Sequence, residues 1–217
     1  MPLKVDLHVH TRHSYDAFVT PKELVNFSKK RGLDGVAITD HDTINGLPEF
    51  SKIAGLLVIP GVEITTSQGH VLALNVSTLF KPGLSFAETV DQIHEAGGLA
   101  VVAHPTAFFK GISEERLGKN FDAMEVINSS AVPFSFSVRK NRKIATNLNL
   151  PQIGGSDAHQ GPEVGMAYTV INAEKNVEEV IKAIKNGDVT PFGKAIPWSL
   201  RLRRQFLAIK KRWTGGV

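Results

Sequence analysis

Short apolar runs alternate with amphipathic stretches along almost the whole chain, and this alternation is the strongest constraint on the fold. It is typical of repeated β-α units, in which each strand is followed by a helix. The runs predict strands at residues 3–8, 36–39, 56–59, 69–76, 99–103, 123–127, 152–154 and 164–171. We therefore expect a single α/β domain with a barrel-like sheet.

Helix starts between these strands carry recognisable capping signals. Thr20 and Glu23 form a capping box with a proline at the first helical position, and Ser85 and Glu88 form a second box. Asn176 is predicted to cap a later helix that ends at Gly187. Two further helices are expected near residues 45–54 and 138–148.

Side chains that can bind metals recur where the predicted strands begin or end. Asp6, His8 and His10 occupy alternating positions, which on a regular strand point to one face. The other members of the set follow or open later strands: His41, Glu63, His70, His104, Asp157 and His159. Because the carboxyl ends of parallel strands meet at one rim of a barrel, we expect these side chains to converge.

The chemistry of this set indicates the metals that it suits. It is rich in imidazole and carboxylate, and the chain contains no cysteine. Such ligands suit zinc, manganese or iron. One four-coordinate ion would leave several candidates unused, so the sequence predicts two or three divalent metal ions. His13 lies close to this set in sequence and is expected either to support a ligand or to face the substrate, whereas His94 is expected to be a solvated helix residue.

The motifs that hold these residues resemble the PHP family, named for polymerase and histidinol phosphatase. They occur in the order typical of that family and span Asp6 to His159. The matching stretches are D-L-H-V-H-T at 6–11, S-Y-D at 14–16, I-T-D-H-D-T at 38–43, P-G-V-E at 60–63, G-H-V-L-A-L at 69–74, A-H-P at 103–105 and G-G-S-D-A-H at 154–159.

The resemblance implies a distorted seven-stranded (β/α) barrel, similar to a TIM barrel, and a site for three metal ions. It implies that the first ion is held by His8, His10, Glu63 and Asp157. Glu63 would bridge to a second ion completed by His70 and His104, and Asp16, His41 and His159 would hold the third. Asp6 and Asp40 are expected to orient imidazoles through hydrogen bonds.

The implied function is that of a metal-dependent phosphoesterase, which hydrolyses a phosphate monoester or a nucleic-acid phosphodiester with a hydroxide activated by two or three metal ions. We expect catalysis to depend on Glu63 and Asp157. The leaving oxygen can be stabilised by the third ion, or protonated by water or by His13. Expected substrate contacts are Asn128, Arg139 and Arg142. Two alternatives stay open: an amidohydrolase-like enzyme, and a non-enzymatic RNA-binding barrel.

One departure from some relatives concerns the pocket wall. Relatives that resemble nucleoside-monophosphate phosphatases carry a large helical insert between the ligands that match His70 and His104. Here only 33 residues, 71–103, separate the two histidines, which is enough for one helix and one strand. The natural substrate, a phosphorylated small molecule or a nucleic-acid end, therefore cannot be taken over from those relatives.

The C-terminal segment differs from the rest in charge. No acidic residue follows Asp188, whereas six arginines and lysines lie between 201 and 212. An apolar stripe at helical spacing is formed by Trp198, Leu202, Phe206, Ile209 and Trp213. We therefore expect a barrel at 1–195 and a basic amphipathic helical extension at 196–217.

Three roles fit this extension. The favoured one is a helix docked on the barrel or on a neighbouring subunit. Contact with a nucleic-acid backbone and attachment to a membrane surface are the alternatives. No apolar run is long enough for a transmembrane helix, and the missing cysteines and charged start favour a cytoplasmic location.

Overall fold

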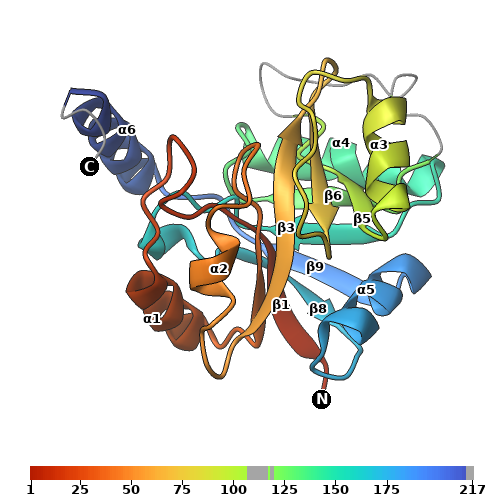
Figure 1. Cartoon of the computed structure of the whole chain (residues 1–217), viewed down its shortest axis with the longest axis horizontal. Helices are drawn as coiled ribbons and strands as arrows, with labels where there is room; N and C mark the ends of the chain where they lie inside the picture. Colours follow the sequence, from red (N-terminus) through yellow and green to blue (C-terminus); the bar gives the residue numbers. More distant parts are fainter. Residues whose placement is uncertain (107–116, 118–119, 214–217) are drawn as a thin grey trace.

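The computed structural model describes residues 1–106, 117 and 120–213. Within them, one nine-stranded sheet has the order β7-β6-β5-β4-β3-β2-β1-β8-β9 (Figure 1). Its strands are β1 (Leu3–Val9), β2 (Gly35–Ile38), β3 (Leu57–Thr65), β4 (His70–Leu74), β5 (Leu99–Val102), β6 (Ala123–Asn128), β7 (Gln152–Gly155), β8 (Ala167–Ile171) and β9 (Val189–Gly193).

Helices connect most of these strands. They are α1 (Pro21–Arg31), α2 (Leu47–Phe50), α3 (Phe86–Glu95), α4 (Phe134–Asn147), α5 (Val177–Asn186) and α6 (Trp198–Trp213), with a 3₁₀ turn at Gly161–Glu163. None of the helices in the described ranges is long and apolar enough to cross a membrane. The capping boxes of α1 and α3 and the Asn176 cap of α5 are present as predicted.

The sheet curls until its two end strands come close to each other. β4 and β8 run antiparallel to both of their neighbours, and the remaining pairs are parallel. At the seam, Gly154 N of β7 donates to Thr169 Oγ1 of β8 over 2.8 Å, and that hydroxyl donates to Gly154 O over 2.9 Å. The sheet is therefore a nearly closed, barrel-like α/β fold.

The expected number of strands was wrong, because the apolar runs predicted eight and the family resemblance implied seven, whereas the described part of the chain forms nine. β9 escaped prediction because it contains Pro191, which cannot donate a hydrogen bond to a sheet. Proline is tolerated in β9 because that strand lies at the end of the sheet order. β3 is also longer than expected and continues through Gly61, where a side chain would lie 2.6 Å from the carbonyl oxygen of Ala73.

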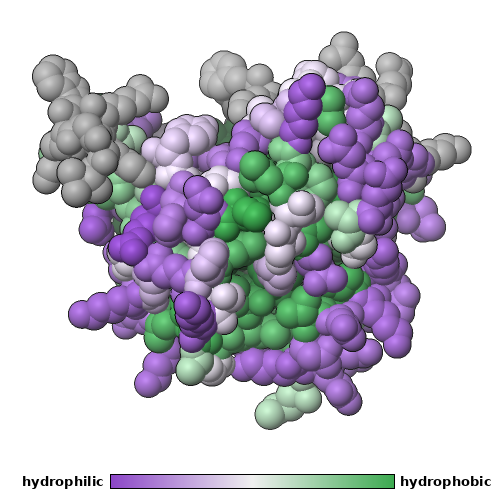
Figure 2. Space-filling model, in the orientation of Figure 1, coloured by the Kyte–Doolittle hydropathy of each residue, from purple (hydrophilic) through white to green (hydrophobic). Residues whose placement is uncertain are grey.

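Apolar side chains fill the barrel and coat its outside. Leu3, Val5 and Leu7 of β1 belong to an interior cluster that also takes in Val180 and Ile184 of α5. A second cluster packs α3 and α4 against the outside of β4–β6, and a third packs α1 and α2 against β1 and β2. Figure 2 shows hydrophobic residues gathered in the middle of one face, over β3, with hydrophilic residues around them.

The first strand, β1, contains an irregularity that sets the direction of its two histidines. Between Asp6 and Val9 its register with β2 shifts, as in a β-bulge. Leu7 therefore packs in the interior cluster while Val9 packs in the outer one. The expectation of one shared face is confirmed for His8 and His10, whose Nε2 atoms lie 3.0 Å apart, and is wrong for Asp6, because the bulge changes the face to which the residues after it point.

Helix α6 extends away from the barrel (Figure 1) with its apolar stripe in solvent. Trp198, Leu202, Phe206 and Ile209 are 69%, 64%, 67% and 56% exposed. The expected docking of this stripe on the barrel is therefore wrong. A different side of α6 meets the barrel, through Arg201 and Arg204. The division at residue 196 stays a prediction.

Candidate metal centre

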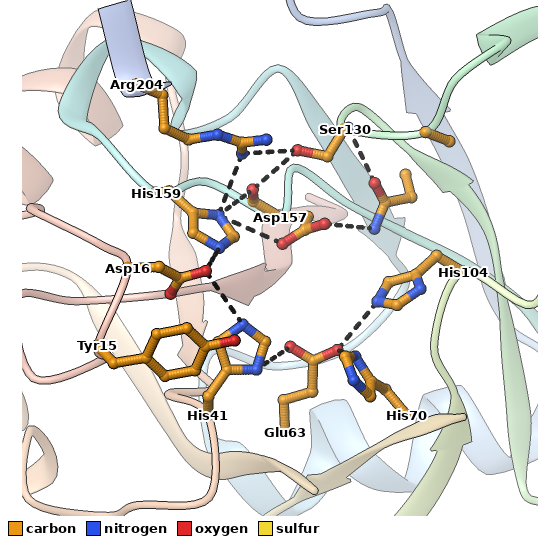
Figure 3. Close-up of a pocket in the computed structure, with 12 residues that line it drawn as sticks. Tyr15, Asp16, His41, Glu63, His70, His104, Ser130, Asp157, His159 and Arg204 are labelled. Carbon is orange, nitrogen blue, oxygen red and sulfur yellow. Dashed lines mark hydrogen bonds and ion pairs between the residues drawn. The ribbon is translucent and has the colours of Figure 1, made fainter. Parts of the chain in front are cut away.

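The strand-end side chains converge in one pocket at the rim of the barrel (Figure 3). The pocket has a volume of about 260 Å³. Its lining comes from segments far apart in the chain: Tyr15, Asp16, His41, Glu63, His70, His104, Asn128, Ser130, Ala131, Asp157, His159 and Arg204. His8 and His10 lie beneath them and are fully buried. The convergence expected from the strand order is thus present.

Glu63 lies at the middle of this cluster, and each of its carboxylate oxygens meets a different group of histidines. Oε2 lies 3.2 Å from Nε2 of both His8 and His10, and 3.1 Å from Nδ1 of His41. Oε1 lies 2.8 Å from His70 Nδ1 and 2.9 Å from His104 Nε2. One fully buried carboxylate therefore connects two groups of imidazoles.

Two aspartates complete the cluster on the opposite side of the pocket. Asp157 Oδ1 lies 3.6 Å from His8 Nε2 and 3.2 Å from His10 Nε2. Asp16 Oδ2 lies 3.2 Å from His159 Nε2 and 3.8 Å from His41 Nε2. The other oxygen of Asp16, Oδ1, is buried and has no hydrogen-bond partner among the described residues.

Four overlapping groups of three side chains could each hold a metal ion. The groups are His8, His10 and Glu63; His8, His104 and Asp157; His41, Glu63 and His70; and His10, His41 and His159. In each group the donor atoms lie within 4.8 Å of one another. Shared members between groups are what a cluster with bridging ligands requires.

Mutual electrostatics keep the acidic members of the cluster charged. Burial raises the pKa of Glu63, but the surrounding histidines, His41 foremost, lower it well below its ordinary value. The pKa of Asp157 is likewise well below its ordinary value, because His8 and its neighbours outweigh the effect of burial. Burial lowers the pKa of His41 to about 3 against the opposing pull of Glu63. Burial also lowers the pKa of His8 and of His10, but the surrounding carboxylates outweigh it and raise both pKa values, that of His10 to about 9, so metal binding there would release protons. Ionised carboxylates and neutral imidazoles are the forms that bind metals.

Glu125 is a functional residue that sequence reasoning missed. It is fully buried on β6, and its Oε1 accepts a hydrogen bond from His8 Nδ1 over 3.1 Å. Its Oε2 accepts from His104 N over 2.9 Å and from Asn128 Nδ2 over 3.0 Å. The available signal was a lone carboxylate inside the apolar run Ala123–Ile127.

The two aspartates expected to orient imidazoles act on the backbone and on hydroxyls instead. Asp6 accepts from the backbone nitrogens of Ser156 and Gly165, both over 2.8 Å, and thereby fixes the segment that leads to Asp157. Burial raises the pKa of Asp6 to about 6 despite these bonds. Asp40 accepts from Ser14 Oγ over 2.8 Å, and Ser14 in turn lies 3.3 Å from His10 Nδ1.

Two members of the cluster adopt backbone conformations that L-residues rarely take. His104 has φ of 30° and Asp157 has φ of 53°. Positive φ costs a residue with a side chain on the order of 1–3 kcal/mol. Such strain concentrates where function fixes a side chain, and both residues point into the pocket (Figure 3).

The remaining predicted contacts lie differently from what we expected. His13 pairs with Glu49 over 2.9 Å, packs edge-on against Phe50 and does not line the pocket. Arg139 and Arg142 are exposed on α4 and do not reach the pocket either. Asn128 does line the pocket, but its amide already donates to Glu125 and Asp157.

Two pocket residues were not assigned to the site from the sequence, although Tyr15 lies in the S-Y-D motif and Arg204 in the basic C-terminal segment. Tyr15 is 72% exposed, and its ring stacks on His41 with 5.2 Å between centroids. Arg204 reaches the rim from α6, and its Nη1 lies 3.2 Å from Ser130 Oγ (Figure 3). Both positions depend on how distant segments pack, which a local pattern does not encode.

Comparison with known proteins finds one matching family model and several similar sequences. A family model described as PHP-associated matches residues 137–189. An uncharacterized protein of Methanocaldococcus jannaschii is 35% identical over 141 residues, which are 58% of this chain and 82% of that protein. A 5'-3' exoribonuclease of Haemophilus influenzae is 40% identical over 82 residues, 35% of this chain and 30% of that enzyme. A 3',5'-nucleoside bisphosphate phosphatase of Chromobacterium violaceum is 37% identical over 79 residues, 33% of this chain and 27% of that enzyme.

The fold also has counterparts among solved structures. A two-domain protein of Bacteroides vulgatus that contains a predicted PHP-like metal-dependent phosphoesterase superposes with a TM-score of 0.68 and 20% identity. The match covers 89% of this chain and 65% of that protein. Agreement in family model, in sequence over most of a relative and in barrel architecture leads to one conclusion: the chain belongs to the PHP family.

Proposed function

We propose that this protein is a metal-dependent phosphoesterase that hydrolyses a phosphate monoester or a phosphodiester at a nucleic-acid end. The observation that carries the proposal is the arrangement around Glu63, whose two oxygens lie within 3.2 Å of five histidines. A single structural hydrogen-bond network has no need of so many imidazoles at one carboxylate. A cluster of two or three divalent ions accounts for all of them.

The donor atoms fit such ions in spacing and in chemistry. Ligands of a tetrahedral ion at 2.0–2.1 Å lie about 3.3 Å apart. The donors of His8, His10, Glu63 and Asp157 lie between 3.0 and 3.6 Å apart wherever a pair is in contact. The buried Oδ1 of Asp16, which has no hydrogen-bond partner within the described ranges, is free to bind an ion. Nitrogen and oxygen donors without thiolate favour zinc, manganese or iron.

The assignment of ligands to ions follows the family pattern. His8, His10, Glu63 and Asp157 would hold the first ion, Glu63, His70 and His104 the second, and Asp16, His41 and His159 the third. When bound, the ions supply Lewis acidity toward phosphoryl oxygens and lower the pKa of water from 15.7 to about 7. The chain itself keeps Glu63 and Asp157 ionised, fixes His8 through Glu125, and surrounds the reacting centre with rigid strand ends.

The substrate class follows from the relatives and from the pocket. Two of the similar proteins are named as an exoribonuclease and a nucleoside bisphosphate phosphatase, and RNA and nucleoside bisphosphates both carry phosphate esters. Between His70 and His104 the structure has β4, α3 and β5, without an inserted cap domain. The pocket is small, so we expect the phosphate and the first group attached to it to enter, while the rest of the substrate stays outside.

The test is turnover of a panel of phosphate compounds by manganese-reconstituted protein. The panel holds nucleoside monophosphates, a nucleoside bisphosphate, a generic diester and 5'-phosphorylated oligonucleotides. We expect release of product from one class, and its loss in the double variant His8→Ala plus His10→Ala. The matched control is His94→Ala, an exposed histidine that pairs with Asp122 away from the pocket.

Other results would point elsewhere. Cleavage of amides without any phosphate ester would replace the proposal with an amidohydrolase. Stable RNA binding that survives the double variant, without turnover of any compound, would replace it with an RNA-binding barrel.

A further inference from the structure

The C-terminal helix brings one positive charge to the metal centre. Arg204 is the only arginine or lysine among the residues that line the pocket in the described structure. The pocket otherwise holds three carboxylates, those of Asp16, Glu63 and Asp157, among its histidines. The Arg204 side chain is 25% exposed and lies at the rim, beside His159 (Figure 3).

The start of α6 is fixed to the barrel by a neighbouring arginine. All three nitrogen positions of the Arg201 guanidinium donate to backbone carbonyls, those of Ile196, Ser130 and Ser129, over 3.0, 2.8 and 3.0 Å. Gln160 Nε2 also donates to the carbonyl of Leu200 over 2.7 Å. This part of the helix is therefore held against the loop that follows β6, one helical turn before Arg204.

Arg204 itself is only weakly engaged. Its Nη1 lies 3.2 Å from Ser130 Oγ, 3.4 Å from His159 Nδ1 and 3.8 Å from Glu163 Oε2. Its Nε and Nη2 form no hydrogen bond with any residue that the structure describes. Glu163 is already occupied, because it accepts from His159 N and Gln160 Nε2.

The contact with His159 weakens further once His159 serves as a ligand. Its Nε2 faces Asp16, so a neutral His159 that offers Nε2 carries its proton on Nδ1. That proton points to Asp157 O, 2.9 Å away. Nδ1 then has no lone pair to accept from Arg204, and two N–H groups face each other. The guanidinium is left with unused donors at the mouth of the pocket.

We propose that Arg204 binds a phosphoryl oxygen of the substrate, so that α6 completes the substrate site. This inference rests on the proposed phosphoesterase function. A planar guanidinium can bind two phosphoryl oxygens at once, and it stays charged at every physiological pH. Ions hold the phosphate from the barrel side, and Arg204 holds it from the rim.

The experiment compares Arg204→Gln and Arg204→Lys with the matched control Arg203→Gln. Arg203 is the preceding residue of α6, is exposed and does not line the pocket. Two quantities are measured on the manganese-loaded protein: KM for the phosphate compound that it turns over, and the dissociation constant of inorganic phosphate by calorimetry. We expect Arg204→Gln to raise both roughly 10- to 100-fold, the loss of a charged hydrogen bond. Arg204→Lys retains the charge and should fall between, and Arg203→Gln should match the wild type.

Two outcomes would overturn the inference. If Arg204→Gln leaves KM and phosphate affinity unchanged but speeds hydrogen exchange of α6, Arg204 only tethers the helix. If calorimetry detects no binding of inorganic phosphate to the wild-type protein, the proposed contact between Arg204 and phosphate is wrong. If no panel compound is hydrolysed, the phosphoesterase proposal fails. The calorimetric comparison of phosphate affinity still decides whether Arg204 binds phosphate, so the two failures can be told apart.

Discussion

At the residue scale, the side chains that position the candidate metal ligands matter as much as the ligands themselves. Glu125 is fully buried and binds His8 Nδ1, which fixes the tautomer in which His8 Nε2 is free to bind a metal. The same carboxylate accepts a hydrogen bond from the backbone nitrogen of His104, a residue with positive φ. Glu125 therefore positions two histidines that come from different strands.

We predict that Glu125→Gln weakens metal binding roughly 10- to 100-fold, because an amide neither compensates the charge near His8 nor accepts as strongly. The measurement is metal affinity by competition with a chelating dye. Glu95→Gln, an exposed change on α3, is the control and should bind as the wild type does. Equal affinities in both variants would show that His8 needs no partner.

Most of the candidate site was predictable from single residues and their positions. His41, His70 and His104 lie at or just beyond strand ends and Glu63 lies near the end of β3, and the order of strands alone brings such positions together. Glu125 was missed because a carboxylate inside a strand looks the same whether it binds water or a buried histidine. Arg204 was missed because its approach to the pocket depends on which side of α6 contacts the barrel. The apolar stripe predicted the wrong side.

At the scale of elements, local signals were most informative at helix starts. Thr20 Oγ1 accepts from Glu23 N over 3.3 Å, and Glu23 Oε2 accepts from Thr20 N over 3.1 Å. Both bonds form within four residues, so they depend little on the rest of the fold. In contrast, β9 and the choice of the side of α6 that contacts the barrel depend on tertiary contacts, so no local signal predicts them.

Thr20→Ala should lower the free energy of unfolding by about 1 kcal/mol, the usual value of an N-cap. Urea denaturation at fixed metal concentration measures the change. Lys22→Ala, at an exposed position of the same turn, should stay within about 0.5 kcal/mol of the wild type. A Thr20→Ala protein as stable as the wild type would mean that tertiary packing alone holds the start of α1.

At the scale of the whole molecule, the proposed ions connect parts of the barrel that are distant in sequence. The ligands come from β1, β3 and β4 and from the segments after β1, β2, β5 and β7. Ions bound there would join both halves of the sheet, which the described structure otherwise holds by strand pairing and apolar packing. Metal and fold are therefore linked thermodynamically.

Removal of metal should lower the melting temperature. At a free metal concentration of 100 times Kd, a single site stabilises the folded state by about 2.7 kcal/mol. Calorimetric scans with and without a chelator measure the shift. The His8→Ala plus His10→Ala protein should show a much smaller shift, and a wild-type protein that melts at the same temperature in both conditions would argue against metal in the barrel.

The position of β1 in the sheet has a consequence for how the protein is made. β1 pairs with β2, the next strand of the chain, and with β8, one of the last. On the ribosome, His8 and His10 emerge early, but Asp157 and His159 arrive only when most of the chain has been synthesised. A nascent chain therefore lacks part of the centre until residues 157–159 have left the ribosome, so a complete set of metal ligands would form late in synthesis, after β1 has waited for β8 to pair with it.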